Sequence, residues 1–115
     1  ERQFKLCMSM FEITECYKKL QAMETATPKQ LLSMSASRFE INVAIRKAFI
    51  DVMANLEKCC PALTNDDLFY CVLSLMHCSN IVILELMNVS SEALKMRKSR
   101  IKGKLREDIF EYIFC

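Results

Sequence analysis

The segment CCPALTNDD, residues 59–67, is the sharpest structural boundary in the sequence. Pro61 cannot occupy a helix interior, so the element before it must end there. Thr64 is a preferred N-cap residue, and Asp67 three positions later can complete a capping box with it. The pattern therefore predicts that one helix ends before this segment and that a new helix begins at Thr64 and covers residues 64–76.

Further capping signals divide the rest of this half of the chain. Ser79 precedes the very apolar stretch IVILELM and is a plausible N-cap, and Ser90 plays the same part for the next helix after the turn NVS. A last amphipathic stretch, EDIFEYIF, closes the sequence. These signals predict helices over 80–87, 91–105 and 107–114.

The first sixty residues also show helical spacing. Residues 1–24 carry apolar side chains at the spacing of one or two amphipathic helices, and TATPK (25–29) is expected to be a turn or linker. Residues 37–58 are expected to form a core-facing helix, although the alternation over 39–45 fits a short strand equally well. Since no partner strand is visible, the fold class we predict is all-α, with N-terminal helices packed with a C-terminal helical bundle.

Composition narrows the class of protein further. The chain has 115 residues, 52% of them hydrophobic, with one Gly and two Pro, which is enough for a core and argues against disorder. Its apolar runs are too short to span a bilayer, so no membrane contact is expected. Seven cysteines in a Met-rich chain with few turn residues indicate buried thiols in a reducing, cytoplasmic compartment. Because the sequence opens with Glu1, we expect a fragment of a longer protein.

Positive charge is concentrated in one short stretch. Residues 61–115 contain seven basic residues, and all of them lie between 95 and 106. Like charges at this spacing repel one another along a helix, and a polyanion offsets that cost. Leu94, Ile101 and Leu105 recur at helical spacing and are expected to be buried. The basic residues are Lys95, Arg97, Lys98, Arg100, Lys102, Lys104 and Arg106.

A short apolar helix, a turn and a basic helix form the layout by which a helix-turn-helix presents its second helix to the DNA major groove. On the face opposite the apolar stripe, Lys95, Met96 and Ser99 are placed to meet base edges. The cations beside them are placed to meet the phosphates on either side of the groove. The DNA-binding residues that we predict are Lys95, Met96, Lys98, Ser99, Arg100, Lys102, Lys104 and Arg106.

Residues 79–105, SNIVILELMNVSSEALKMRKSRIKGKL, resemble the helix-turn-helix of LuxR/NarL-type transcription regulators. Residues 63–78 are similar to the helix that precedes it in that family. The ending R-x-x-R-I-x-x-K-L is also reminiscent of the C-terminal domains of bacterial tetratricopeptide-repeat regulators. The residues that match the family pattern, without a gap, are Asn80, Ile83, Val89, Ser90, Lys95, Ile101, Lys104 and Leu105.

The resemblance implies different roles for the two parts of the chain. Residues 61–115 would be a LuxR-like DNA-binding domain, with 80–87 as the scaffold helix and 91–105 as the recognition helix. Residues 1–60 would be a connector or dimerisation segment. The apolar positions of 1–24 are expected to form the interface of a weak or DNA-assisted homodimer. Ile81 and Leu84 make the scaffold helix more apolar than usual, so it either packs on the N-terminal helices or offers a surface to a partner.

Other function classes find less support in the residues. We expect no enzyme, because the single histidine, His77, has no acidic partner or oxyanion donor marked in the sequence, and one glycine cannot build a phosphate loop. The cysteines do not have zinc-finger spacing, so neither a metal nor another cofactor is expected. The alternative function is a sigma-region-like adaptor whose basic helix binds an acidic partner or an RNA polymerase subunit. Duplex DNA is the preferred partner.

Overall fold

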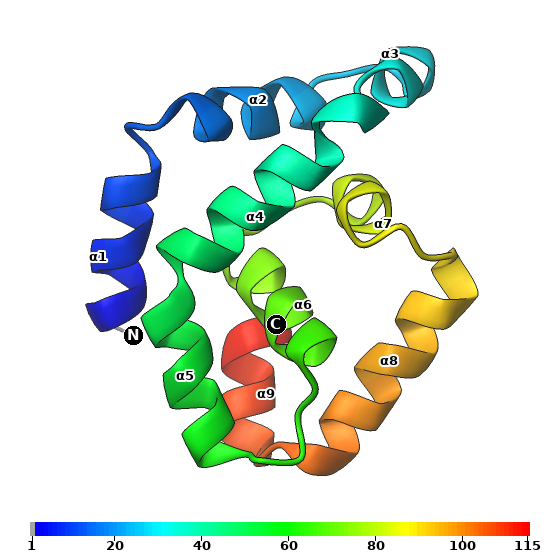
Figure 1. Cartoon of the computed structure of the whole chain (residues 1–115). Coiled ribbons are helices and arrows are strands. Elements are labelled where there is room, and N and C mark those ends of the chain that lie inside the picture. The colour runs from blue at the N-terminus through cyan, green and yellow to red at the C-terminus, as the bar shows by residue number, and fades with distance from the viewer. Residues whose placement is uncertain (1) are drawn as a thin grey trace. The chain divides into compact units, whose positions relative to one another are not determined.

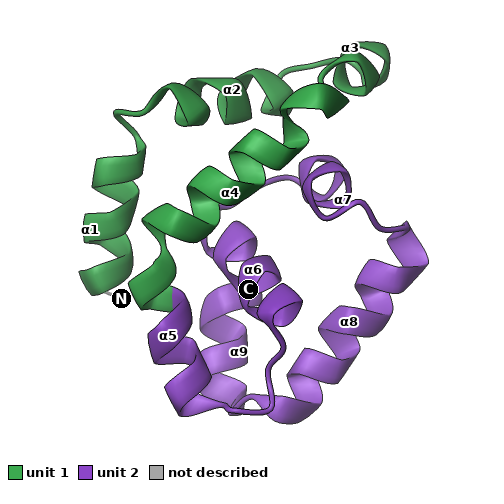
Figure 2. Cartoon of the chain, viewed as in Figure 1, with its two compact units in different colours: residues 1–52 green, residues 53–115 purple. Residues whose placement is uncertain are grey.

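The computed structural model describes residues 2–115, and this part of the chain is all-α, as predicted. It contains α-helices and one 3-10 turn, with no strand among these residues. The alternation over 39–45 therefore belongs to a helix. The chain divides into two compact units, residues 1–52 and 53–115 (Figure 2). The division falls inside a helix, whereas the sequence suggested a boundary at 60/61.

The first unit is built around α4 (Arg38–Ala48), which packs against α1 (Arg2–Phe11) and α2 (Glu15–Glu24) (Figure 1). Phe11 and Phe49 form the centre of its core, with their ring centroids 5.8 Å apart and edge to face. Both rings are almost fully buried, so they anchor the three helices through apolar contact.

Two expectations for this unit were wrong in detail. TATPK is not all linker, because Pro28 begins α3 (Pro28–Ser33), where Thr27 and Gln30 form a capping box. Proline suits the first helical position because that N–H needs no partner within the helix. The helix expected over 37–58 is also divided, since Phe49 leaves helical geometry at φ −108° and ψ 23°. The result is α4 followed by α5 (Ile50–Cys59), after the 3-10 turn Ser35–Ser37.

The second unit contains the end of α5 and four further helices: α6 (Asn65–Leu75), α7 (Asn80–Met87), α8 (Ser91–Lys104) and α9 (Glu107–Phe114). Helix α6 is the central element, since it packs against α7 and α9 and residues 67–73 are all buried. Helix α8 packs on α9. The observed bounds of α7 and α9 agree with the predicted helices at both ends, and those of α6 and α8 agree to within a residue at each end.

The seven cysteines are free thiols, but their environments differ from the expectation of uniform burial. Cys60 and Cys71 are buried, whereas Cys59 and Cys115 are exposed. The Cys60 thiol donates to the Lys104 carbonyl oxygen over 3.3 Å, which ties the end of α8 to the segment that follows α5.

Candidate nucleic-acid interface

Helices α7 and α8 are joined by a tight, well-capped turn. The Ser79 hydroxyl accepts from the Val82 amide at the start of α7, and the Ser90 hydroxyl accepts from the Ala93 amide at 3.2 Å at the start of α8. Asn88 ends α7 in the left-handed region, at φ 55°, which asparagine tolerates better than most residues. In Figure 1 α7 is viewed along its axis while α8 runs across the picture, so the two helices are steeply inclined to each other.

The apolar stripe of α8 lies inward, as predicted. Leu94 and Leu105 are nearly inaccessible and Ile101 is fully buried. Around this stripe the side chains of α8 divide into two flanks and an outer face, because successive residues turn by about 100°.

The first flank is neutralised by one carboxylate. Asp67 of α6 is only 3% exposed, and its Oδ1 accepts from Arg97 Nη1 at 2.8 Å. Its Oδ2 accepts from Lys104 Nζ at 3.2 Å and from the Thr64 amide at 3.0 Å. Lys104 Nζ also donates to the Ala62 carbonyl oxygen at 3.1 Å. Lys104 was predicted to contact a phosphate. In the structure its ammonium group is bound by Asp67 and by the Ala62 carbonyl oxygen, near the start of α6.

These contacts shift the titration of the carboxyl group. Burial by itself would raise the pKa of Asp67, because it disfavours the charged form. The hydrogen bonds from Thr64, Arg97 and Lys104, together with the positive charge of Lys104, outweigh that effect and hold the pKa below its ordinary value. Asp67 is thus ionised at neutral pH and balances the cations of this flank.

The second flank of α8 carries Lys95, Lys98 and Lys102, which we call the lysine ridge. All three side chains are exposed, and none has an ion pair within residues 2–115. An open hollow of about 370 Å³ runs beside them, lined also by Ser99 and by Phe110 of α9. No acidic side chain lines it, so the ridge presents uncompensated positive charge.

The outer face of α8 is also accessible. Met96 is 61% exposed, and Ser99 and Arg100 are exposed as well. Arg106 lies beyond the helix and pairs with Asp108, with 2.8 Å between Nη2 and Oδ2. The Arg106 hydrogen bond lowers the pKa of the Asp108 carboxyl. Of the predicted site residues, six therefore lie together on the ridge and outer face, while Lys104 and Arg106 each hold a carboxylate.

Sequence reasoning did not assign Asp67, Phe110 and Phe114 to the site. Asp67 was recognised as a cap, but nothing local shows that it also binds two cations of α8, some thirty residues away. The aromatic residues of α9 were visible only as an amphipathic pattern. Their relation to the lysines depends on how α9 packs against α8.

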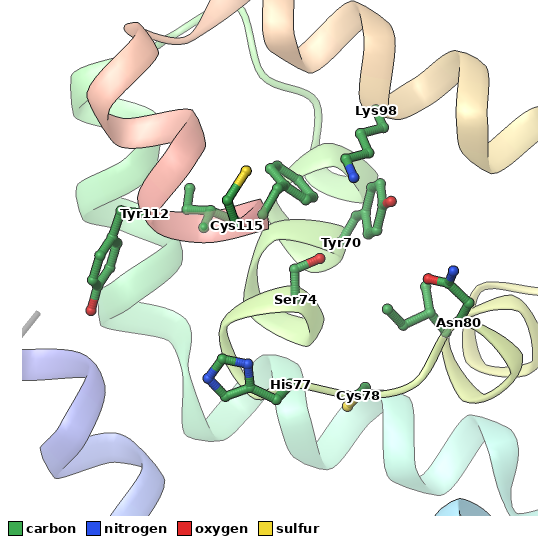
Figure 3. A pocket seen from close by; sticks show the side chains of 11 residues that line it. Tyr70, Ser74, His77, Cys78, Asn80, Lys98, Tyr112 and Cys115 are labelled. Atoms are coloured by element: carbon green, nitrogen blue, oxygen red, sulfur yellow. The ribbon is translucent and has the colours of Figure 1, made fainter.

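A second hollow, of about 270 Å³, lies between α6 and the end of α9 (Figure 3). Tyr70 and Ser74 line it together with His77, and Lys98 reaches towards Tyr70 from α8. The neighbouring thiol of Cys71 is a poor nucleophile at neutral pH, because burial raises its pKa to about 12. Among residues 2–115, no group of three acidic, histidine or cysteine side chains is placed to hold a metal ion.

Comparisons with known proteins add no family and no relative to these observations. In the part of the chain that the structure describes, no helix is long and apolar enough to cross a membrane. No family model matches the sequence, and neither a curated protein nor a solved structure is significantly similar to the chain.

Proposed function

We propose that residues 61–115 bind double-stranded DNA as a helix-turn-helix of the LuxR/NarL type and act in transcription regulation. The proposal is carried by the position of α8 and by the exposure of its cations. This helix follows a short helix and a capped turn, buries its apolar stripe, and leaves an exposed face with unpaired cations. A surface of this kind is complementary to the phosphates of a major groove.

The proposal gives the exposed residues different tasks. Lys95, Met96 and Ser99 would meet base edges, where a lysine suits guanine and a methionine suits the thymine methyl group. Lys98, Arg100 and Lys102 would bind phosphates and set the register. Because Lys104 and Arg106 already hold carboxylates, we assign them a secondary part in binding.

The salt dependence of binding tests this assignment. Fluorescence anisotropy with a labelled random duplex should show affinity that falls with salt. Three phosphate contacts, from Lys98, Arg100 and Lys102, predict a slope of log affinity against log salt of about −2.7 per bound chain. Contact by all seven cations of the basic stretch predicts about −6. Affinity that does not change with salt is incompatible with the proposal.

Single substitutions separate the two kinds of contact. Lys102→Ala should weaken binding to all duplexes alike and reduce the slope by about 1, whereas Lys95→Ala should also relax base preference in a selection from random sequences. The matched control is Lys58→Ala, because Lys58 is an exposed lysine of α5 outside the interface. If the control weakens binding as much as Lys102→Ala, the contacts are not those of α8.

The same assay distinguishes the adaptor function. An acidic protein partner, such as an RNA polymerase subunit, should remain bound to α8 in the presence of excess competitor DNA. We favour DNA because the exposed cations lie on the second of two helices joined by a short turn, which is the layout that enters a major groove. A regulator of this type would work in the cytoplasm, where the exposed thiols of Cys59 and Cys115 stay reduced.

A further inference from the structure

Helix α9 presents aromatic rings beneath the lysine ridge. The ring centroids of Phe110 and Phe114 are 4.8 Å apart, and Phe114 meets Tyr70 of α6 edge to face at 5.1 Å. Phe110 and Tyr70 are buried, while Phe114 is partly accessible. The three rings form a continuous aromatic platform, fixed by packing between α6 and α9.

Two lysines of the ridge lie over this platform. Lys98 Nζ is 5.4 Å from the centroid of Phe114, and Lys102 Nζ is 5.8 Å from the centroid of Phe110. Both distances lie within the range in which an ammonium group is attracted to an aromatic face. The third lysine of the ridge, Lys95, has no ring contact within residues 2–115 and provides an internal comparison.

We propose that Phe110 and Phe114 are positioning residues, which hold the ammonium groups of Lys102 and Lys98 in place for phosphate binding. The inference rests on the proposed DNA-binding function and deepens it. A lysine side chain has many rotamers, and binding must select the few that reach a phosphate. A ring beneath the ammonium group restricts these rotamers before DNA arrives and leaves the opposite side of the group open to an anion.

The packing supports this role over a purely structural one. The rings cover the inner side of each ammonium group, and the side chains of Lys98 and Lys102 remain exposed. No carboxylate lines the adjoining hollow to compete for them. On the opposite flank, by contrast, Asp67 neutralises Arg97 and Lys104. The two flanks thus hold their cations by different means, and only the aromatic one leaves the charge available.

A double-mutant cycle tests the pairing of Phe114 with Lys98. Phe114→Leu keeps an apolar side chain but removes the ring. It should weaken binding to a random duplex about two- to five-fold, because Lys98 would then lose its rotamer freedom on binding rather than beforehand. In a Lys98→Ala background the same substitution should have no further effect. In a Lys95→Ala background it should retain its full effect, because Lys95 does not lie over the ring.

A conservative replacement of Phe114 is the second part of the test. Phe114→Tyr retains the aromatic face and should keep near wild-type affinity. Urea unfolding of every variant establishes that the folded fraction is unchanged in the binding assay. Equal losses from Phe114→Leu in the Lys98→Ala and Lys95→Ala backgrounds, or no loss at all, overturn the inference and leave the DNA-binding function intact. If the wild-type chain does not bind duplex DNA, the proposed function fails first and the inference fails with it.

Discussion

Asp67 offers the most direct test of how α8 is held. Asp67→Asn removes the charge that Arg97 and Lys104 share but keeps a side-chain oxygen for the Thr64 amide. Removing one partner of a fully buried ion pair costs about 3–5 kcal/mol, because the remaining charge has no compensation. Here the side chains of Arg97 and Lys104 are 20% and 28% exposed, so both can turn partly towards water.

This partial exposure places the expected loss below the range for full burial. We expect Asp67→Asn to lower the free energy of unfolding by about 2–3 kcal/mol. Asp67→Ala also removes its half of the capping box at the start of α6, which adds about 1 kcal/mol. The two variants should therefore differ by about the value of the cap, and the larger part of each loss should come from the charge.

Urea unfolding followed by far-ultraviolet circular dichroism at about pH 7 measures both losses. The control is Glu111→Gln, since Glu111 is exposed on α9 and its side chain has no ion pair within residues 2–115; its effect should stay within about 0.5 kcal/mol. A loss of less than about 1 kcal/mol for Asp67→Asn would falsify the view that this carboxylate fixes the base of α8. Such a value is typical of an exposed pair.

Three further outcomes follow from individual residues. The pKa of Asp67 is lower in the folded chain than in the unfolded chain. Its contribution to stability is therefore complete above the unfolded pKa of about 3.9 and is lost as pH falls through the folded pKa. The difference in unfolding free energy between wild type and Asp67→Asn should accordingly disappear in acid. His77 is exposed and has φ 62°, so His77→Gly should raise the urea midpoint by the equivalent of about 0.5–1 kcal/mol; an unchanged or lower midpoint contradicts strain at this position. If residues 1–24 contain the homodimer interface, Met10→Glu should shift sedimentation towards the monomer, since Met10 is 71% exposed on α1. A wild-type chain that is monomeric at all concentrations, both free and in the presence of duplex DNA, excludes this interface.

The sequence was most informative where short polar side chains cap helices. Thr64 and Asp67 form the predicted capping box, and Ser79 and Ser90 cap α7 and α8 as expected. A cap acts within four residues, so the relevant information is local and can be read from neighbouring positions. The helix bounds of the C-terminal half were predicted more closely than those of the N-terminal half, where the capping box of Thr27 and Gln30 is an equally local signal that the prediction did not use.

Elements that depend on distant packing were not predicted. The break at Phe49 has no proline or glycine to mark it, and the fully buried ring of Phe49 packs against Phe4 and Phe11 of α1. Similarly, the pairing of Lys104 with Asp67 joins residues thirty-seven positions apart. Spacing along α8 placed the cations on faces, but it could not show which face meets a carboxylate and which meets an aromatic ring.

The number of cations on a helix therefore overstates the charge that it can offer to DNA. Asp67 completes the capping box of α6 and binds one flank of α8, so a single carboxylate links the start of α6 to α8. Those two cations contribute to folding, whereas Lys95, Lys98 and Lys102 retain uncompensated charge. Because Asp67 already neutralises Arg97 and Lys104, their flank attracts phosphates only weakly. We therefore expect α8 to bind the DNA backbone mainly from the side of the lysine ridge. The proposed DNA-binding surface is therefore asymmetric, and if α8 enters a major groove, ethylation interference should find the strongest phosphate contacts on one side of that groove.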